Sequence, residues 1–140
     1  MNSAAGANGA NLPIIALAMG DPAGISPELT AKLLALDEIR AAAHLVVFGD
    51  IRVLEAGARV AGIRPELQVV QPGTPIRPGL KPIFVDLGHL DPSDVQLGQA
   101  TPVGGAFALE NFRQALLMAH RGEADAVCFT PFNKQAMRYV

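Results

Sequence analysis

Short, uninterrupted apolar runs alternate with stretches of helical periodicity, and this alternation constrains the fold more than any other feature of the chain. The expected strands occupy residues 14–19, 44–48, 67–70, 83–85 and 126–129, and the first of them is a continuous apolar run. Continuous apolar runs are typical of strands that are buried on both faces of a parallel sheet. The order of strands and helices therefore predicts an α/β fold, with a largely parallel sheet and helices on both faces.

Capping signals predict where the helices begin and end. Ser26 is expected to be the N-cap of the first helix, with Pro27 as its first residue, and apolar spacing extends that helix to about Ala42. Thr101 before a proline repeats the N-terminal signal, and Gly62 is expected to end the second helix. Several prolines between residues 72 and 82 indicate a loop or a sheet edge there.

Composition restricts the class of protein. With 140 residues, half of them hydrophobic, the chain can form about one packed domain. A net charge of −2 argues against nucleic acid or an anionic membrane as the main partner. Apolar runs fall short of the roughly 18 residues that span a bilayer, and no basic residue precedes the first run. We expect a soluble, cytoplasmic protein, with a flexible tail over residues 1–11 and one α/β portion over residues 12–140.

The loop at residues 20–26 is the first candidate site, because it joins a buried strand to a capped helix. Gly20 and Gly24 would let a ligand approach the backbone, and the helix N-terminus would offer N–H groups to an anion. The loop matches neither a dinucleotide fingerprint nor a P-loop. An ordinary strand-to-helix turn, in which Asp21 bonds its own backbone, explains the same residues.

The loop at residues 130–134 is the second candidate site. Thr130, Asn133 and Lys134 place a hydroxyl, an amide and an ammonium group directly after a buried strand. Lys134 could hold a phosphate or carboxylate as a point charge, with Asn133 beside it. Alternatively, Thr130 or Asn133 caps the next helix and Lys134 is solvated.

The remaining reactive residues predict no catalytic set. His44, His89 and His120 lack metal-ligand spacing and are expected to be structural or exposed. Cys128 is the single cysteine; it cannot form an internal disulfide and is expected to be an inert thiol in the core. No metal site is assigned to this chain.

Two motifs resemble one enzyme family. AMGDPAGISPE at residues 18–28 closely resembles the opening motif of the 4-hydroxythreonine-4-phosphate dehydrogenase family, which usually has glycine where Ser26 stands. DAVCFTPFNK at residues 125–134 is similar to a strand and following loop of that family, and Gly98 and the glycines at 104–105 also fit. Phe132 and Asn133 resemble the branch of 4-phospho-threonate or 4-phospho-erythronate dehydrogenases.

The resemblance implies an isocitrate dehydrogenase-like fold and NAD- or NADP-dependent oxidation of a 4-phosphorylated hydroxy acid, with decarboxylation. It also implies a divalent metal held by histidines, a homodimer, and a role in pyridoxine biosynthesis. Family members are about twice as long or more, and their Gly-His-Thr motif and metal histidines have no counterpart here. We therefore expect an N-terminal portion that is inactive by itself.

On this resemblance, the candidate cofactor-binding residues are Gly20, Asp21 and Gly24, and the candidate substrate-binding residues are Thr130, Asn133 and Lys134. Two alternatives remain open. One is a phosphate acyltransferase of the same fold, which the GDPAGI motif disfavours. The other is a non-catalytic remnant that binds a small anion or a partner.

Overall fold

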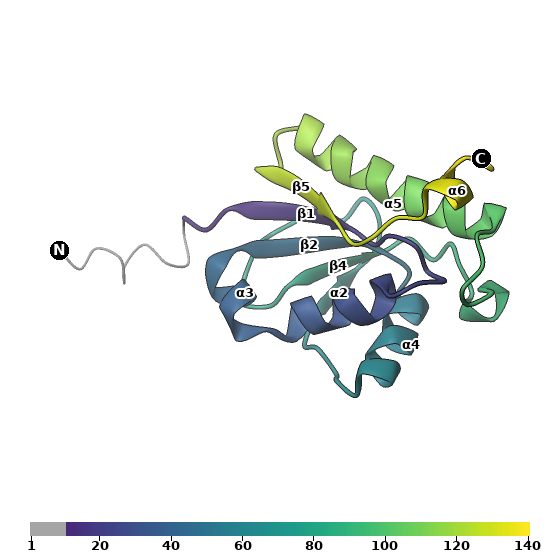
Figure 1. The fold of residues 1–140 in the computed structure, drawn as a ribbon. Helices are drawn as coiled ribbons and strands as arrows, with labels where there is room; N and C mark the ends of the chain where they lie inside the picture. Colours follow the sequence, from purple (N-terminus) through teal and green to yellow (C-terminus); the bar gives the residue numbers. More distant parts are fainter. Residues whose placement is uncertain (1–10) are drawn as a thin grey trace.

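A five-stranded parallel sheet forms the centre of the computed structural model, which describes residues 11–140 (Figure 1). The strands lie in the order β3-β4-β2-β1-β5, and every pairing is parallel. Their bounds are β1 (Ile14–Ala18), β2 (His44–Gly49), β3 (Gln68–Val70), β4 (Ile83–Asp86) and β5 (Ala126–Phe129). The predicted α/β class is confirmed. The tail expected over residues 1–11 lies outside the described residues, apart from Asn11.

Helices cover both faces of the sheet (Figure 1). They are α2 (Ser26–Ala35), α3 (Asp37–Ala42), α4 (Ile51–Ala61), α5 (Pro102–His120) and α6 (Lys134–Met137), with a 3-10 turn η1 (Pro92–Asp94). Helices α2 and α4 pack on one face over Leu17, Val47 and Phe84. Helix α5 packs on the other face over Ala18 and Val46. No helix within residues 11–140 is long and apolar enough to cross a membrane.

The predicted start and end of the first helix are wrong. Ile25 is the N-cap of α2, and Ser26 already lies inside the helix, where its hydroxyl donates a 2.7 Å hydrogen bond to the carbonyl of Pro131. Leu36 has extended backbone and separates α2 from α3. Asp37 and Glu38 then occupy the first turn of α3, where negative charge matches the positive end of the helix dipole.

The prediction of a buried Cys128 is also wrong. Strand β5 has β1 as its one neighbour among the described strands, so it lies at the edge of the sheet. Cys128 is exposed, and Phe129 is 54% exposed. Other local predictions are confirmed: Thr101 accepts a 3.1 Å bond from the Gly104 N–H, and Gly62 ends α4 with φ of 70°.

Candidate functional site

The two candidate loops leave neighbouring strands and turn to opposite faces of the sheet (Figure 1). Residues 20–25 connect β1 to α2, whereas residues 130–133 connect β5 to α6, which packs on α5. Divergence of this kind at the carboxyl ends of parallel strands creates the place where ligands bind in open α/β sheets. The topology therefore puts both loops at one candidate site.

Hydrogen bonds join these loops, which are far apart in the sequence. The Gly20 N–H donates to the Thr130 hydroxyl at 2.9 Å, and the Asp21 N–H donates to the Pro131 carbonyl at 2.8 Å. Thr130 is only 2% exposed, and the Thr30 hydroxyl lies 3.3 Å from its oxygen. Because these groups are buried and paired, the two loops form one rigid unit.

Gly20 is required by packing in this unit. A Cβ atom at residue 20 would lie 2.2 Å from the carbonyl oxygens of both Thr130 and Pro131. Asp21 accepts a 3.0 Å bond from the Ala23 N–H, which is the local turn that its residue type favours. Gly24 is exposed. The structure thus places Gly20 inside the loop contact and Gly24 on the surface.

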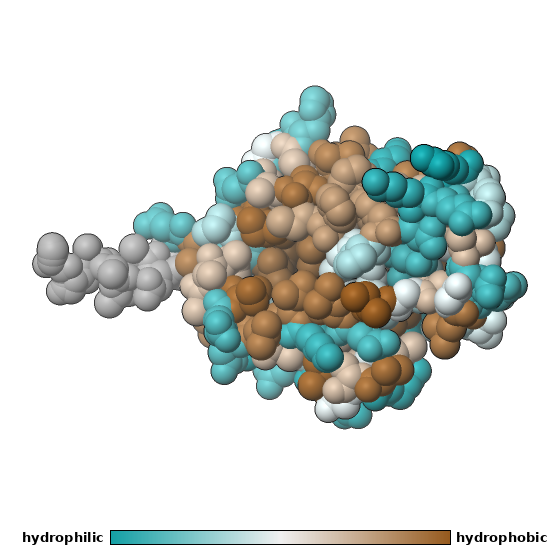
Figure 2. All heavy atoms as spheres, viewed as in Figure 1, coloured by the Kyte–Doolittle hydropathy of each residue, from teal (hydrophilic) through white to brown (hydrophobic). Residues whose placement is uncertain are grey.

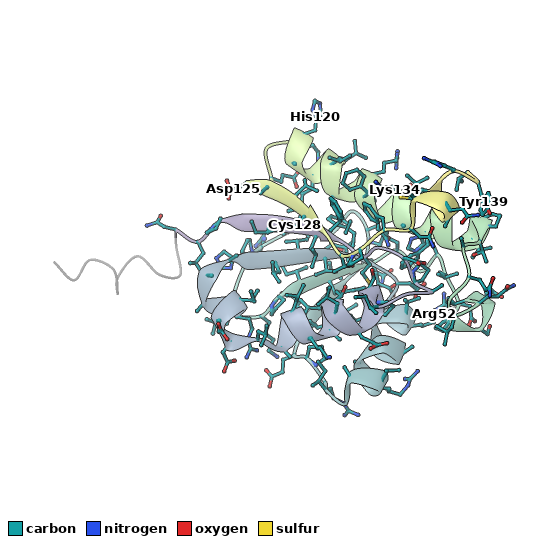
Figure 3. All side chains as sticks on the ribbon, viewed as in Figure 1. Arg52, His120, Asp125, Cys128, Lys134 and Tyr139 are labelled. Atoms are coloured by element: carbon teal, nitrogen blue, oxygen red, sulfur yellow. The ribbon has the colours of Figure 1, made fainter. Side chains whose placement is uncertain are left out.

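The three residues of the second loop have different environments. Thr130 is buried in the loop contact, and Asn133 caps α6 by accepting a 3.1 Å bond from the Ala136 N–H. Lys134 is exposed in the first turn of α6 (Figure 3), and no ion pair within residues 11–140 involves it. Lys134 is the only charged residue of the three, and its ammonium group is available to a ligand.

We expect Thr130→Val to lower the free energy of unfolding by about 1–3 kcal/mol. Valine keeps the shape of the side chain but leaves the buried Gly20 N–H without an acceptor. Thr130→Ser, which keeps the hydroxyl, is the matched control. Urea denaturation of both variants measures the difference, and equal losses would show that the hydroxyl is not what holds the loops together.

Sequence reasoning missed Asn111, which supports the first loop from the other face of the sheet. Its side chain is fully buried, and its amide donates a 3.0 Å bond to the Met19 carbonyl at the start of the loop. His89 stacks on Phe107 with ring centroids 4.7 Å apart, and its burial lowers the pKa of the imidazole. The sequence did carry a signal for Asn111: it is a polar residue at helical spacing from the apolar Phe107 and Ala115, which places it on the buried face of α5.

Asp50 is a second missed residue, at the carboxyl end of β2. Its carboxylate is fully buried and accepts 2.9 Å bonds from the backbone N–H groups of Leu90 and Arg52. The Arg52 guanidinium donates to it as well, at 2.9 Å. Burial by itself would raise the pKa of Asp50, but these hydrogen bonds outweigh burial and hold the pKa below its ordinary value. Asp50 therefore anchors α4 and the loop after β4.

Comparison with known proteins shows which family the chain resembles. The sequence profile of the pyridoxal phosphate biosynthetic protein PdxA matches residues 41–139. A Rhizobium meliloti protein with the provisional name 4-hydroxythreonine-4-phosphate dehydrogenase 2 is 61% identical over 128 residues, which cover 91% of this chain and 37% of the relative. D-threonate 4-phosphate dehydrogenase of Cupriavidus necator is 35% identical, with coverage of 90% and 38%.

A solved structure agrees. The crystal structure of a 4-hydroxythreonine-4-phosphate dehydrogenase from Burkholderia phymatum superposes with a TM-score of 0.78 at 30% identity, covering 91% of this chain and 39% of that one. The chain spans about two fifths of the length of the relatives that it matches. It belongs to the PdxA family of pyridoxal phosphate biosynthetic proteins.

Proposed function

We propose that this chain supplies the N-terminal α/β portion of an NAD(P)-dependent dehydrogenase. The substrate would be a 4-phosphorylated hydroxy acid, such as 4-phosphohydroxy-threonine or 4-phospho-threonate, which is oxidised and decarboxylated. Membership of the PdxA family and the names of the relatives support this proposal. The observation that carries it is the exposed Lys134 in the first turn of α6, directly after the loop that follows β5 and that buried hydrogen bonds hold in place.

In this proposal, Lys134 binds the anionic end of the substrate as a point charge. Thr130 and Asn133 belong to the same substrate loop, and their hydrogen bonds fix the position from which the lysine extends. A charged group on a rigid support loses little freedom when its ligand binds, and this favours affinity. The chain's own contribution to catalysis is therefore to bind and orient the substrate.

Gly20, Asp21 and Gly24 are proposed to lie beside the dinucleotide. Among the described residues, no side chain caps α2, so N–H groups of its first turn remain available to an anion such as a pyrophosphate. The exposed Gly24 lets a ligand approach the backbone there. The nicotinamide, when bound, supplies the hydride acceptor.

A divalent metal does not fit the residues that the structure describes. No group of three or more His, Cys, Asp or Glu side chains in residues 11–140 could hold a metal ion. We therefore assign no step of the reaction in this chain to a metal. The complete enzyme is proposed to act as a cytoplasmic homodimer.

A chimera tests the proposal. Residues 12–140 would replace the matching segment of the Rhizobium meliloti relative, which is 61% identical to this chain. We expect reduction of NAD or NADP with a 4-phosphorylated hydroxy acid, and the absorbance of the reduced nicotinamide follows the reaction. A folded chimera that is inactive with every such substrate, or that instead transfers acyl groups to phosphate, would contradict the proposal.

Lys134→Ala in this chimera should lower kcat/KM about tenfold to a hundredfold. That range corresponds to the loss of a charge-assisted hydrogen bond of about 1.5–3 kcal/mol. Lys81→Ala, which removes another exposed lysine, is the matched control and should leave kcat/KM unchanged. The melting temperature should barely change in either variant, because exposed charges contribute little to stability. Normal kinetics with a lowered melting temperature would make Lys134 structural.

A further inference from the structure

The peptide between Met19 and Gly20 is held at both of its polar atoms by side chains from other parts of the fold. Its carbonyl accepts a 3.0 Å hydrogen bond from the Asn111 amide of α5, and its N–H donates a 2.9 Å bond to the Thr130 hydroxyl after β5. Both of these side chains are buried. This one peptide therefore joins the loop after β1 to α5 and to the loop after β5.

The Asn111 amide that supports this peptide is bonded at one of its two ends. Its Oδ1 atom is buried and has no hydrogen-bond partner among the described residues. On the face seen in Figure 2, hydrophilic residues lie mainly around the rim, where water satisfies them, so a buried acceptor of this kind is an exception. An amide held at one end can turn about its side-chain torsions. The position of the Met19 carbonyl therefore depends on what binds the Asn111 Oδ1 atom.

His89 lies beside this amide and offers the group that it lacks. Both ring nitrogens of His89 are buried, also without a hydrogen-bond partner among the described residues. The ring stacks on Phe107, one helical turn before Asn111, with centroids 4.7 Å apart. The Asn111 side chain and the Phe107 backbone are polar neighbours that would raise the pKa of His89, but burial has the larger effect and lowers it. A neutral imidazole carries one N–H donor, and Oδ1 of Asn111 is an acceptor in need of one.

We propose that His89 is a positioning residue: one of its ring N–H groups donates to the Asn111 Oδ1 atom, and through Asn111 it holds the Met19–Gly20 peptide in place. His89 follows β4 in the chain, so this polar relay connects the carboxyl ends of β1, β4 and β5 inside the molecule. The effect of His89 on the peptide is independent of any activity. Its consequence for ligand binding by the two loops rests on the proposed function.

Amide hydrogen exchange of Gly20, followed by NMR in the 140-residue chain, tests the proposal without any substrate. His89→Phe keeps a ring on Phe107 but removes the N–H donor, and should speed exchange of the Gly20 amide about fivefold to a hundredfold. His89→Asn and His89→Gln lose the ring but each places an amide N–H near one of the ring nitrogens, and one of the two should restore slow exchange. His120→Phe, at an exposed position at the C-terminal end of α5 (Figure 3), is the matched control and should leave exchange unchanged.

NMR of the ring nitrogens tests the same bond in the wild-type chain and needs no variant. Because burial keeps His89 neutral, we expect one ring N–H that exchanges slowly with solvent. A ring N–H that exchanges as fast as that of an exposed histidine would overturn the proposal. Unchanged exchange of Gly20 in His89→Phe would overturn it as well. So would a loss that neither amide variant restores, since the ring would then act by packing alone.

The chimera described above connects the relay to ligand binding. His89→Phe in the chimera should lower kcat/KM about threefold to tenfold, because the loops that meet the ligands are less well held, and the amide variant that restores slow exchange should restore kcat/KM too. Full activity of the His89→Phe chimera, together with fast exchange at Gly20, would overturn the positioning role. An inactive parent chimera would contradict the proposed function alone, because the exchange of Gly20 decides the role of His89 in the absence of substrate.

Discussion

Gly20→Ala should lower the free energy of unfolding by about 3 kcal/mol, at the upper end of the range for overpacked sites. A methyl group at this position would overlap two backbone carbonyls, those of Thr130 and Pro131, each 2.2 Å away. Backbone atoms held by a sheet cannot move aside as a flexible side chain can. The loops must separate, and the bonds from Gly20 and Asp21 to the second loop are then lost. Urea denaturation measures the effect.

Gly24→Ala is the matched control in the same loop. Its Cβ would lie 3.3 Å from a carboxylate oxygen of Asp21, which is the end of a flexible side chain. Neither glycine has positive φ, so the backbone conformation accepts alanine at both positions. We expect Gly24→Ala to change stability by less than about 1 kcal/mol. Equal effects of the two substitutions would mean that the loop contact is not tightly packed.

Asp50→Ala should lower the free energy of unfolding by about 2–4 kcal/mol. The change removes the N-cap of α4, which contributes about 1 kcal/mol, and leaves the buried Leu90 N–H without an acceptor, which costs about 1–3 kcal/mol. Asp94→Ala, which removes an exposed carboxylate in η1, is the control and should have little effect. Chemical denaturation at pH 7 compares the two.

The contribution of Asp50 should also depend on pH. The folded-state pKa of Asp50 lies below its ordinary value of 3.8, so the unfolded chain takes up a proton more readily. The stabilisation is therefore fully present above pH 3.8 and is lost as the pH falls through the lower folded-state pKa. Asp50→Ala should lose less stability than the wild type over this acid range. A parallel loss in both proteins would show that other groups cause the acid sensitivity.

Local patterns in the sequence predicted most strands and helix boundaries well, because residues close together in the sequence determine these features. Continuous apolar runs identified β1, β2 and β4, and the Thr101 and Gly62 signals predicted helix boundaries within one turn. Ser26 failed as a cap because its hydroxyl bonds Pro131, which lies 105 residues further along the chain. Cys128 failed because apolar composition does not reveal which strand lies at an edge.

At the candidate site too, local patterns predicted some features, and contacts between distant residues decided the others. The position of both loops at the carboxyl ends of strands followed from the strand and helix order alone. The bond between Gly20 and Thr130 did not, because it requires β1 and β5 to be neighbours, and the sequence does not state that pairing. The support from Asn111 and Asp50 also depends on contacts between distant elements. Whether Gly20, Asp21 and Gly24 bind a cofactor stays a prediction.

The central position of β1 determines the order in which the chain can fold during synthesis. β1 is made first among the strands, yet its two neighbours are β2 and β5, and β5 ends at Phe129. A nascent chain can join β1 to β2 early, but the other side of β1 stays unpaired by β5 until residues 126–129 have left the ribosome. Long-range pairing of this kind slows folding, and an open strand edge favours aggregation.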